Sequence, residues 1–169
     1  MSAKKKALGT AGAIGLVEDE EQMADDFLVI NGDILTDLDF RQLLSYHRKQ
    51  KAMATLTVKE RVVKTDFGVI KFDAAGILTD YIEKPEHKSY VSIGINVLNK
   101  HSRKYIAYNE SIGIPELMLK LRNARKKVVC FKTKADWMDL GRLDDFEAAQ
   151  EIFARDSFRF LKSNEGFSI

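Results

Sequence analysis

Apolar residues along the chain fall into runs and spacings that predict alternating strands and helices. A continuous apolar run at 27–31 (FLVIN) predicts a strand covered on both faces, since a strand with one wet face would alternate. Helical spacing of apolar residues follows from Phe40 to about Gln50, and the β-branched stretch 53–58 (MATLTV) predicts a second strand. Strand, helix and strand in this order predict a right-handed βαβ unit.

A hairpin interrupts this pattern in the middle of the chain. Residues 67–73 (FGVIKFD) and 77–84 (ILTDYIEK) flank a turn at 74–76 and predict two paired strands. The other predicted elements are a short helix at 10–17, a strand at 90–98, helices at 100–108, 115–124 and 143–156, and a strand at 128–133. We therefore predict an α/β domain over residues 1–156, with a mixed, mostly parallel, Rossmann-like sheet, an inserted β-hairpin and a C-terminal tail at 157–169.

Composition restricts the classes of protein and partner. With 169 residues, of which 45% are hydrophobic and 31% charged, the chain suits one globular domain rather than a disordered tail. A formal net charge of +2 gives no sign of a nucleic-acid partner, and no apolar stretch approaches the ~20 residues that span a bilayer. The start, with Lys4 to Lys6, lacks the pattern of a secretory signal. The single cysteine, Cys130, excludes an internal disulfide, fits a reducing cytoplasm and is expected to be a small buried core residue.

Two acidic residues lie just beyond predicted strands. Asp33 comes at the carboxyl end of the first strand, where open α/β sheets bind ligands, and Asp139 follows the last strand. Two carboxylates at one rim of a sheet could share a divalent cation, because Mg²⁺ takes one or two carboxylates together with phosphate oxygens. The alternative is that each acid caps its own turn or helix, as we expect of Asp37 or Asp39 near the start of the helix at 40–50.

Other candidate sites also have structural alternatives. Glu83 and Lys84, fixed by Pro85 at a strand end, could present an acceptor to hydroxyls and a cation to phosphate, or form a surface charge pair. Residues 9–15 (GTAGAIG) lack the spacing and the preceding strand of a dinucleotide fingerprint and fit a small-residue turn that packs closely. The three histidines stand at no zinc-ligand spacing, and the sequence contains no P-loop motif. Gly94 inside a strand indicates that another group approaches closely.

Several short segments occur in an order that is typical of one enzyme family. They are LGTAGA (8–13), FLVINGD (27–33), FGVI (67–70), IEKP (82–85), SIGINVL (92–98) and WMDLGRLDDF (137–146). In this order they resemble the sugar-1-phosphate nucleotidyltransferases, or NDP-sugar pyrophosphorylases, from about residue 7 to 149. These include mannose-1-phosphate guanylyltransferases and glucose-1-phosphate thymidylyltransferases. The resemblance implies a glycosyltransferase-A-like fold and attack of a sugar-1-phosphate oxygen on the α-phosphorus of a nucleoside triphosphate, with release of pyrophosphate.

The resemblance also implies roles for individual residues. Asp33 and Asp139 match the two Mg²⁺ ligands, and Lys84 matches the cation that holds the sugar phosphate, so these three form the implied catalytic set. The segment that lies against the nucleobase and ribose matches Leu8, Gly9, Thr10, Ala11 and Gly12. The contacts to the sugar match Gly68, Glu83, Ser92 and Gly94.

The chain departs from the family at its start. The family's glycine-rich GGxGTR loop, which wraps the triphosphate, is absent from the sequence. We therefore expect an N-terminally truncated nucleotidyltransferase domain with little activity alone, whose uncovered strand at 27–31 leads it to self-associate. The LGTAG and WxDxGR forms favour a guanylyltransferase-like member. The alternative is a non-catalytic homologue that binds a sugar nucleotide or a partner subunit. A dehalogenase-type phosphatase is disfavoured, because Asp37 and Asp39 follow the strand too late.

Overall fold

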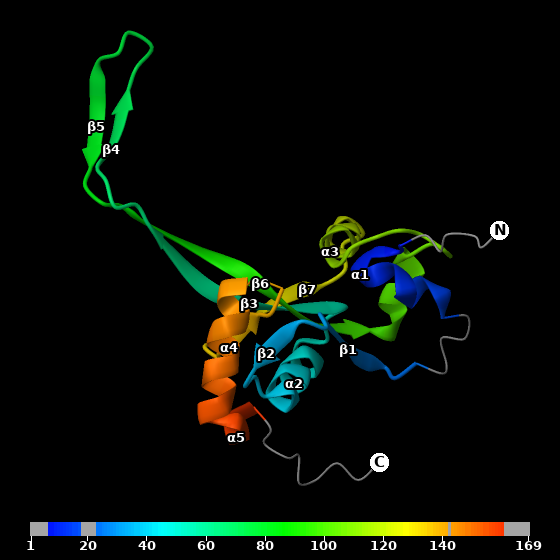
Figure 1. Cartoon of the computed structure of the whole chain (residues 1–169). Helices are drawn as coiled ribbons and strands as arrows, with labels where there is room; N and C mark the ends of the chain where they lie inside the picture. Colours follow the sequence, from blue (N-terminus) through cyan, green and yellow to red (C-terminus); the bar gives the residue numbers. More distant parts are fainter. Residues whose placement is uncertain (1–6, 18–22, 142, 161–169) are drawn as a thin grey trace, which may run out of the picture.

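The structure is a computed structural model that describes residues 7–17, 23–141 and 143–160 (Figure 1). Its elements in chain order are α1 (Gly9–Gly12), the 3₁₀ helix η1 (Ala13–Leu16), β1 (Asp26–Ile30), β2 (Ile34–Thr36), α2 (Phe40–Gln50), β3 (Ala54–Lys64), β4 (Val69–Phe72), β5 (Leu78–Ile82), β6 (Glu86–Asn99), the 3₁₀ helix η3 (Lys100–Tyr105), α3 (Ile114–Asn123), β7 (Val128–Lys132), β8 (Trp137–Asp139), α4 (Leu143–Arg155) and α5 (Ser157–Phe160). Predictions that concern residues 1–6, Arg142 and residues 161–169 lie outside the described residues.

A four-stranded sheet in the order β1-β6-β3-β7 forms the centre of the described chain. Strand β6 runs antiparallel to both β1 and β3, whereas β7 is parallel to β3. Three strands therefore point in one direction and β6 points in the other, which confirms the predicted α/β class with a mixed sheet. β1 and β3 are parallel but separated by β6, so α2 connects strands that are not direct neighbours.

Hydrophobic side chains cover both faces of this sheet. Along β6, Ile95 and Val97 turn to one face and pack in a cluster with Leu43 of α2. Leu98 turns to the other face and packs in a cluster with Leu117 of α3. This alternation is the two-residue period of a strand buried on both sides. Figure 1 shows α2 and α3 on opposite sides of the sheet accordingly.

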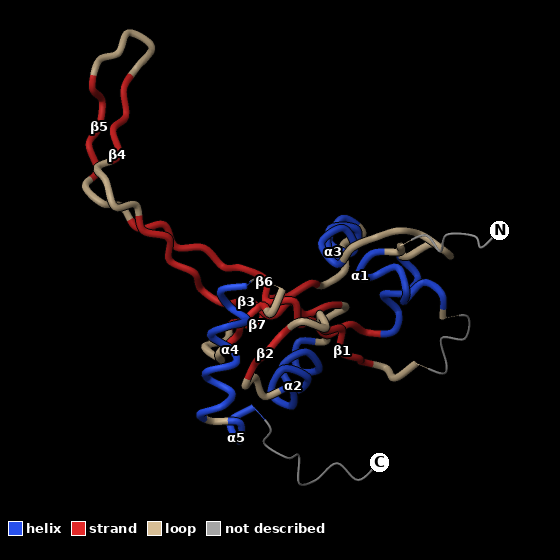
Figure 2. The backbone as a smooth tube through the Cα atoms, viewed as in Figure 1, coloured by secondary structure: helices blue, strands red, loops and turns tan. Residues whose placement is uncertain are grey.

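Strands β3 and β6 extend beyond the sheet as a two-stranded ribbon that pairs residues 59–64 with residues 86–91. At its tip β4 and β5 form the predicted hairpin, with Val69 opposite Ile82. We call residues 59–91 the arm, and Figures 1 and 2 show it projecting from the rest of the molecule. Large apolar side chains of the arm are exposed, Phe67 at 79% and Phe72 at 67%.

The structure differs from the sequence predictions at several elements. The helix predicted at 10–17 is a short α-helix followed by the 3₁₀ turn η1, in keeping with the low helix propensity of its glycines, and the one predicted at 100–108 is the 3₁₀ helix η3. Cys130 was expected to be buried but is exposed, because β7 is an edge strand and it is the neighbouring Phe131 that packs on the α2 side. β1 forms the other edge, with Phe27 and Leu28 packed on opposite faces, as predicted for a strand covered on both.

Candidate functional site

Asp33 and Asp139 meet at one end of the short ribbon that β2 and β8 form. The two strands pair antiparallel with Ile34 opposite Asp139, and the N–H of Leu140 donates to the carbonyl oxygen of Asp33 at 2.7 Å. A β-carbon built on Gly141 would lie 3.1 Å from Oδ2 of Asp33 and 3.2 Å from Oδ1 of Asp139. The two carboxylates therefore face one small space, which the glycine at position 141 leaves open.

The acids near this site also have local structural roles. Oδ1 of Asp139 accepts a hydrogen bond from the N–H of Gly141 at 3.1 Å, so Asp139 caps its own turn. Asp39 caps α2 by accepting from the N–H groups of Arg41 and Gln42 at 2.9 and 3.4 Å. Partial burial opposes ionisation of Asp39, but these backbone hydrogen bonds outweigh it and lower its pKa. The capping oxygen, Oδ1, is also the atom of Asp139 that faces the space beside Gly141, and a carboxylate oxygen has a second lone pair with which to bind a cation.

Gly94 of β6 fixes the chain on either side of Asp33. Its φ is +74°, and its carbonyl oxygen accepts from the N–H of Asn31 at 3.0 Å. A β-carbon at this position would lie 2.6 Å from Nδ2 of Asn31 and 2.9 Å from Cδ1 of Ile34. The close approach that the sequence predicted at Gly94 is therefore confirmed, and the groups that approach it flank Asp33.

The predicted sugar contacts on the arm lie apart from the two carboxylates. Glu83 and Lys84 are exposed on the arm between β5 and β6, and Figure 1 shows the arm directed away from β2 and β8. Gly68, also on the arm, lies against Tyr81, whose hydroxyl oxygen would be 2.5 Å from a β-carbon at position 68. Ser92 is exposed on β6, next to the irregularity in the pairing of β3 with β6. The structure thus brings Asp33, Asp139 and Gly94 together but not the residues of the arm.

The segment predicted to contact a nucleobase, residues 8–12, packs against residues 110–114. The N–H of Ile112 donates to the carbonyl oxygen of Leu8 at 2.9 Å, and the N–H of Ala11 donates to the carbonyl oxygen of Ile112 at 3.0 Å. A β-carbon on Gly9 would lie 2.6 Å from that same carbonyl oxygen. Small residues therefore let two backbone segments pack closely, as the structural alternative predicted. Figure 1 shows α1 beside α3, away from β2 and β8.

A polar cluster at the opposite end of the β2–β8 ribbon was not predicted from the sequence. The guanidinium of Arg159 on α5 donates to the carboxylates of Asp37 and Asp136. The two partners are 122 and 23 positions away from Arg159, and no local spacing indicates such a contact. The C-terminal segment that begins at residue 157 is thereby attached to the loops that carry β2 and β8.

The donor set at the two carboxylates consists of hard oxygen ligands, which suit cations such as Mg²⁺. Among the described residues there is no group of three or more His, Cys, Asp or Glu side chains that could hold a metal. Asp33 and Asp139 alone supply two carboxylates, the number that Mg²⁺ takes when water and substrate phosphates complete its octahedron. A structural zinc site would need four protein ligands, whereas two carboxylates are compatible with a hard cation such as Mg²⁺ whose other ligands are water and phosphate oxygens.

Among the helices in the described residues, none is both long and apolar enough to cross a membrane.

The sequence of the chain is similar to those of known proteins. The family model described as nucleotidyl transferase matches residues 1–155. The chain is 26% identical over 148 residues to mannose-1-phosphate guanylyltransferase catalytic subunit beta of Drosophila pseudoobscura pseudoobscura, covering 86% of this chain and 40% of that protein. It is 28% identical over 161 residues to UTP–glucose-1-phosphate uridylyltransferase of Synechocystis sp., covering 89% of this chain and 41% of that protein.

A solved structure shares the fold. HddC from Yersinia pseudotuberculosis, complexed with GMP-PN, superposes on the chain with a TM-score of 0.58 at 21% sequence identity. The superposition covers 89% of this chain and 64% of HddC. The chain spans about two fifths of the length of the curated relatives it matches.

Proposed function

The chain belongs to the nucleotidyl transferase family, and we propose that the whole protein transfers a nucleotidyl group from a nucleoside triphosphate to a sugar 1-phosphate. The observation that carries this proposal is the convergence of Asp33 and Asp139 on the space beside Gly141. Two ionised carboxylates facing one space repel each other, and a cation between them removes the repulsion. A cation held in this way is what a reaction between two phosphates requires.

The proposed reaction joins one phosphate to another. An oxygen of the sugar 1-phosphate forms a bond to the α-phosphorus of the triphosphate, the bond from that phosphorus to the bridging oxygen of the β-phosphate breaks, and pyrophosphate leaves. Asp33 and Asp139 would hold Mg²⁺, which when bound neutralises charge on the phosphates. The ribbon formed by β2 and β8 keeps the two carboxylates in register, and Gly141 leaves room for a phosphate oxygen close to both. Rate enhancement then comes from positioning and charge neutralisation rather than from a protein base.

We propose GTP and mannose 1-phosphate as the substrates, and the cytoplasm as the location, where the exposed thiol of Cys130 would stay reduced. The name of the guanylyltransferase relative supports this choice of substrates. Residues 8–12 remain candidates for contact with the nucleobase, and Glu83 and Lys84 for contact with the sugar and its phosphate. Because Glu83 and Lys84 lie on the arm, between β5 and β6, we expect the 169-residue chain alone to turn over slowly or not at all. Losing even one electrostatic contact to a transition state costs about 3–4 kcal/mol.

Binding of GTP with Mg²⁺ tests the cation site directly. Isothermal titration of the chain with GTP should show binding that requires Mg²⁺ and is lost in Asp33→Asn and in Asp139→Asn. The matched control is Asp25→Asn, which removes the same charge from a side chain that is 80% exposed. Binding that survives both substitutions would contradict the proposed role of the carboxylates.

A second function, non-catalytic binding of a sugar nucleotide, is favoured by one observation. Lys84, the implied catalytic cation, lies between β5 and β6 on the arm, and Figure 1 shows the arm directed away from β2. A coupled assay of pyrophosphate release on the whole protein separates the two functions. Turnover that depends on Asp33 supports the transferase, whereas binding of GTP without turnover supports the non-catalytic homologue.

We also propose that the chain self-associates. Strand β1 pairs on one side with β6 and, in the described part of the chain, has no strand on its other side. Free strand edges and uncovered apolar surface both favour pairing with another copy. Sedimentation equilibrium should therefore show a mass above 19.2 kDa at high protein concentration. A well-folded monomer under those conditions would count against this part of the proposal.

A further inference from the structure

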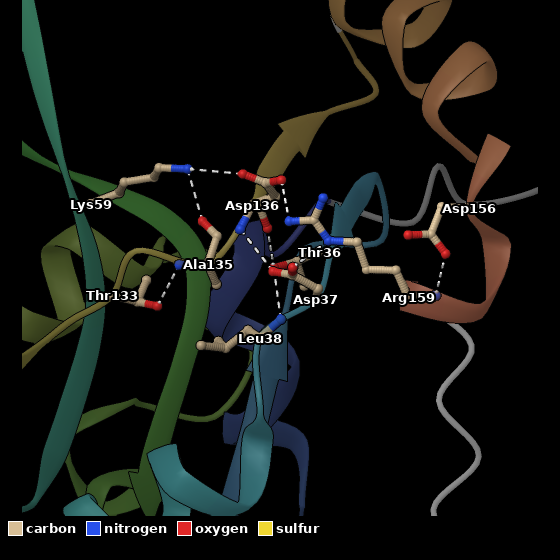
Figure 3. Close-up of polar contacts among 9 residues, drawn as sticks. All are labelled: Thr36, Asp37, Leu38, Lys59, Thr133, Ala135, Asp136, Asp156 and Arg159. Carbon is tan, nitrogen blue, oxygen red and sulfur yellow. Dashed lines mark hydrogen bonds and ion pairs between the residues drawn. The ribbon is translucent and has the colours of Figure 1, made fainter. Parts of the chain in front are cut away.

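Arg159 bridges the two loops at the end of the β2–β8 ribbon that lies away from Asp33 and Asp139 (Figure 3). Its Nε donates to Oδ2 of Asp37 at 2.7 Å, and its Nη2 donates to Oδ2 of Asp136. Asp37 directly follows β2, and Asp136 directly precedes β8. We call Arg159, Asp37 and Asp136 the Arg159 bridge.

Further contacts join the same two loops to each other and to the base of the arm. The N–H of Asp136 donates to Oδ1 of Asp37 at 2.7 Å, and the hydroxyl of Thr36 donates to the carbonyl oxygen of Asp136 at 2.6 Å. Nζ of Lys59, on β3, lies 3.9 Å from Oδ1 of Asp136. The same Nζ donates to the carbonyl oxygen of Ala135 at 2.8 Å. The loops are thus tied to the base of the arm by Lys59 and to α5 by Arg159.

The β2–β8 ribbon depends on such contacts because it is very small. Each strand has three residues, and in the described sheets they pair only with each other. Two strands alone are marginally stable in water, so the contacts at their ends decide how well the pairing is held. Asp37 and Asp136 also bring two carboxylates close together, and without a cation between them these would repel. The planar guanidinium of arginine can donate to both acceptors at once.

We propose that Arg159 is a positioning residue for the Asp33–Asp139 pair. By joining Asp37 to Asp136 it fixes the register of β2 on β8, and with it the relative placement of the two carboxylates at the other end of the ribbon. A slip of one residue would turn Asp139 to the opposite face, so loose pairing means loss of the shared space. This inference rests on the proposed function, since it gives Arg159 a role at the cation site of that function.

Binding of Mn²⁺, followed by electron paramagnetic resonance of the free ion, tests this role without any need for turnover. Arg159→Gln should weaken Mn²⁺ binding about tenfold, the lower end of what losing an outer-shell partner costs. Arg159→Lys keeps the charge but reaches only one carboxylate, so binding should recover only in part. The matched control is Arg155→Gln, which removes a cation from an exposed i,i+4 pair with Glu151 on α4 and should bind Mn²⁺ like the wild type.

Hydrogen exchange measured by mass spectrometry supplies the readout that separates positioning from a general loss of structure. In Arg159→Gln, exchange should quicken in peptides that cover 33–38 and 135–141 and stay unchanged in peptides from β6. Wild-type Mn²⁺ affinity together with wild-type exchange in Arg159→Gln would overturn the inference. So would faster exchange throughout the chain, since Arg159 would then support the fold and not the ribbon.

Asp33→Asn separates failure of this inference from failure of the proposed function. If the wild type and Asp33→Asn bind Mn²⁺ equally, the cation site of the proposed function is wrong, and the positioning role falls with it. If Asp33→Asn loses binding but Arg159→Gln keeps it, the cation site stands and the role of Arg159 is refuted.

Discussion

Replacing Gly94 by alanine should damage both the fold and the carboxylate pair. The φ of +74° at this position costs an ordinary L-residue about 1–2 kcal/mol. The new β-carbon would also lie 2.6 Å from Nδ2 of Asn31 and 2.9 Å from Cδ1 of Ile34. Relieving such overpacking typically costs about 1–3 kcal/mol. We therefore expect Gly94→Ala to lower the free energy of unfolding by about 2–5 kcal/mol.

Urea unfolding followed by far-ultraviolet circular dichroism measures this loss as a lower midpoint at an unchanged slope. Gly76→Ala is the matched control, because Gly76 has a φ of +80° but no atom within 4 Å of the added β-carbon. The control should lose only the unfolding free energy that the positive φ costs an alanine, about 1–2 kcal/mol. The difference between the two variants, about 1–3 kcal/mol, then measures the collision with Asn31 and Ile34.

Two results would refute this reasoning. Equal losses in Gly94→Ala and Gly76→Ala would show that Asn31 and Ile34 move aside freely. Ile34 pairs directly with Asp139, so a forced shift at Ile34 should also weaken Mn²⁺ binding in Gly94→Ala and leave it unchanged in Gly76→Ala. Unchanged Mn²⁺ affinity in Gly94→Ala would break the proposed link between this glycine and the carboxylates.

Three further predictions concern the core, the pH dependence and the thiol. Leu117→Ala should cost about 2–5 kcal/mol of unfolding free energy because Leu117 is fully buried, whereas Leu119→Ala on the exposed side of the same helix should cost little; similar losses would contradict the packing of α3. Burial lowers the pKa of His47 more than its contact with Asp26 raises it, so the folded chain binds this proton less readily than the unfolded chain. The stability that neutral His47 contributes to the folded chain is therefore fully present above its unfolded pKa of 6.5 and is lost as the pH falls through its lower folded pKa. The melting temperature should accordingly drop between about pH 7 and 5. His47→Gln should flatten that slope, and an equally steep slope in the variant would exclude His47 as its source. Exposed Cys130 should react with a thiol reagent in the native protein, and protection until unfolding would be inconsistent with its place on the edge strand.

The long elements could be predicted from the sequence because each has a clear apolar period. Helix α2 begins and ends at the predicted residues, Phe40 and Gln50, and its apolar stripe packs on the sheet through Leu43. The hairpin of β4 and β5 was equally readable from its turn. β2 and β8 were not predicted, since three residues are too few to show a period and their pairing joins segments about a hundred positions apart.

Local reasoning could not decide the roles of individual acids. Asp37 and Asp39 are equivalent candidates for the cap of α2 in the sequence, yet Asp39 caps the helix and Asp37 binds Arg159. The same limit applies to Asp139, which caps its own turn and also faces Asp33. A carboxylate that caps its own turn can therefore also face a second carboxylate, and its neighbours in the sequence do not show whether it does.

The arm has exposed apolar side chains, and it also carries Lys84, which the proposed reaction requires near Asp33 and Asp139. A two-stranded hairpin that stands alone is marginally stable, and the arm leaves Phe67 and Phe72 exposed. A surface that covers these side chains and also brings Lys84 toward Asp33 and Asp139 would stabilise the arm and complete the proposed substrate site together. Self-association then has two expected sources, the free edge of β1 and the exposed side chains of the arm, and the position of Lys84 on the arm leads us to expect low turnover. A stable monomer with full turnover would be inconsistent with the position of the arm.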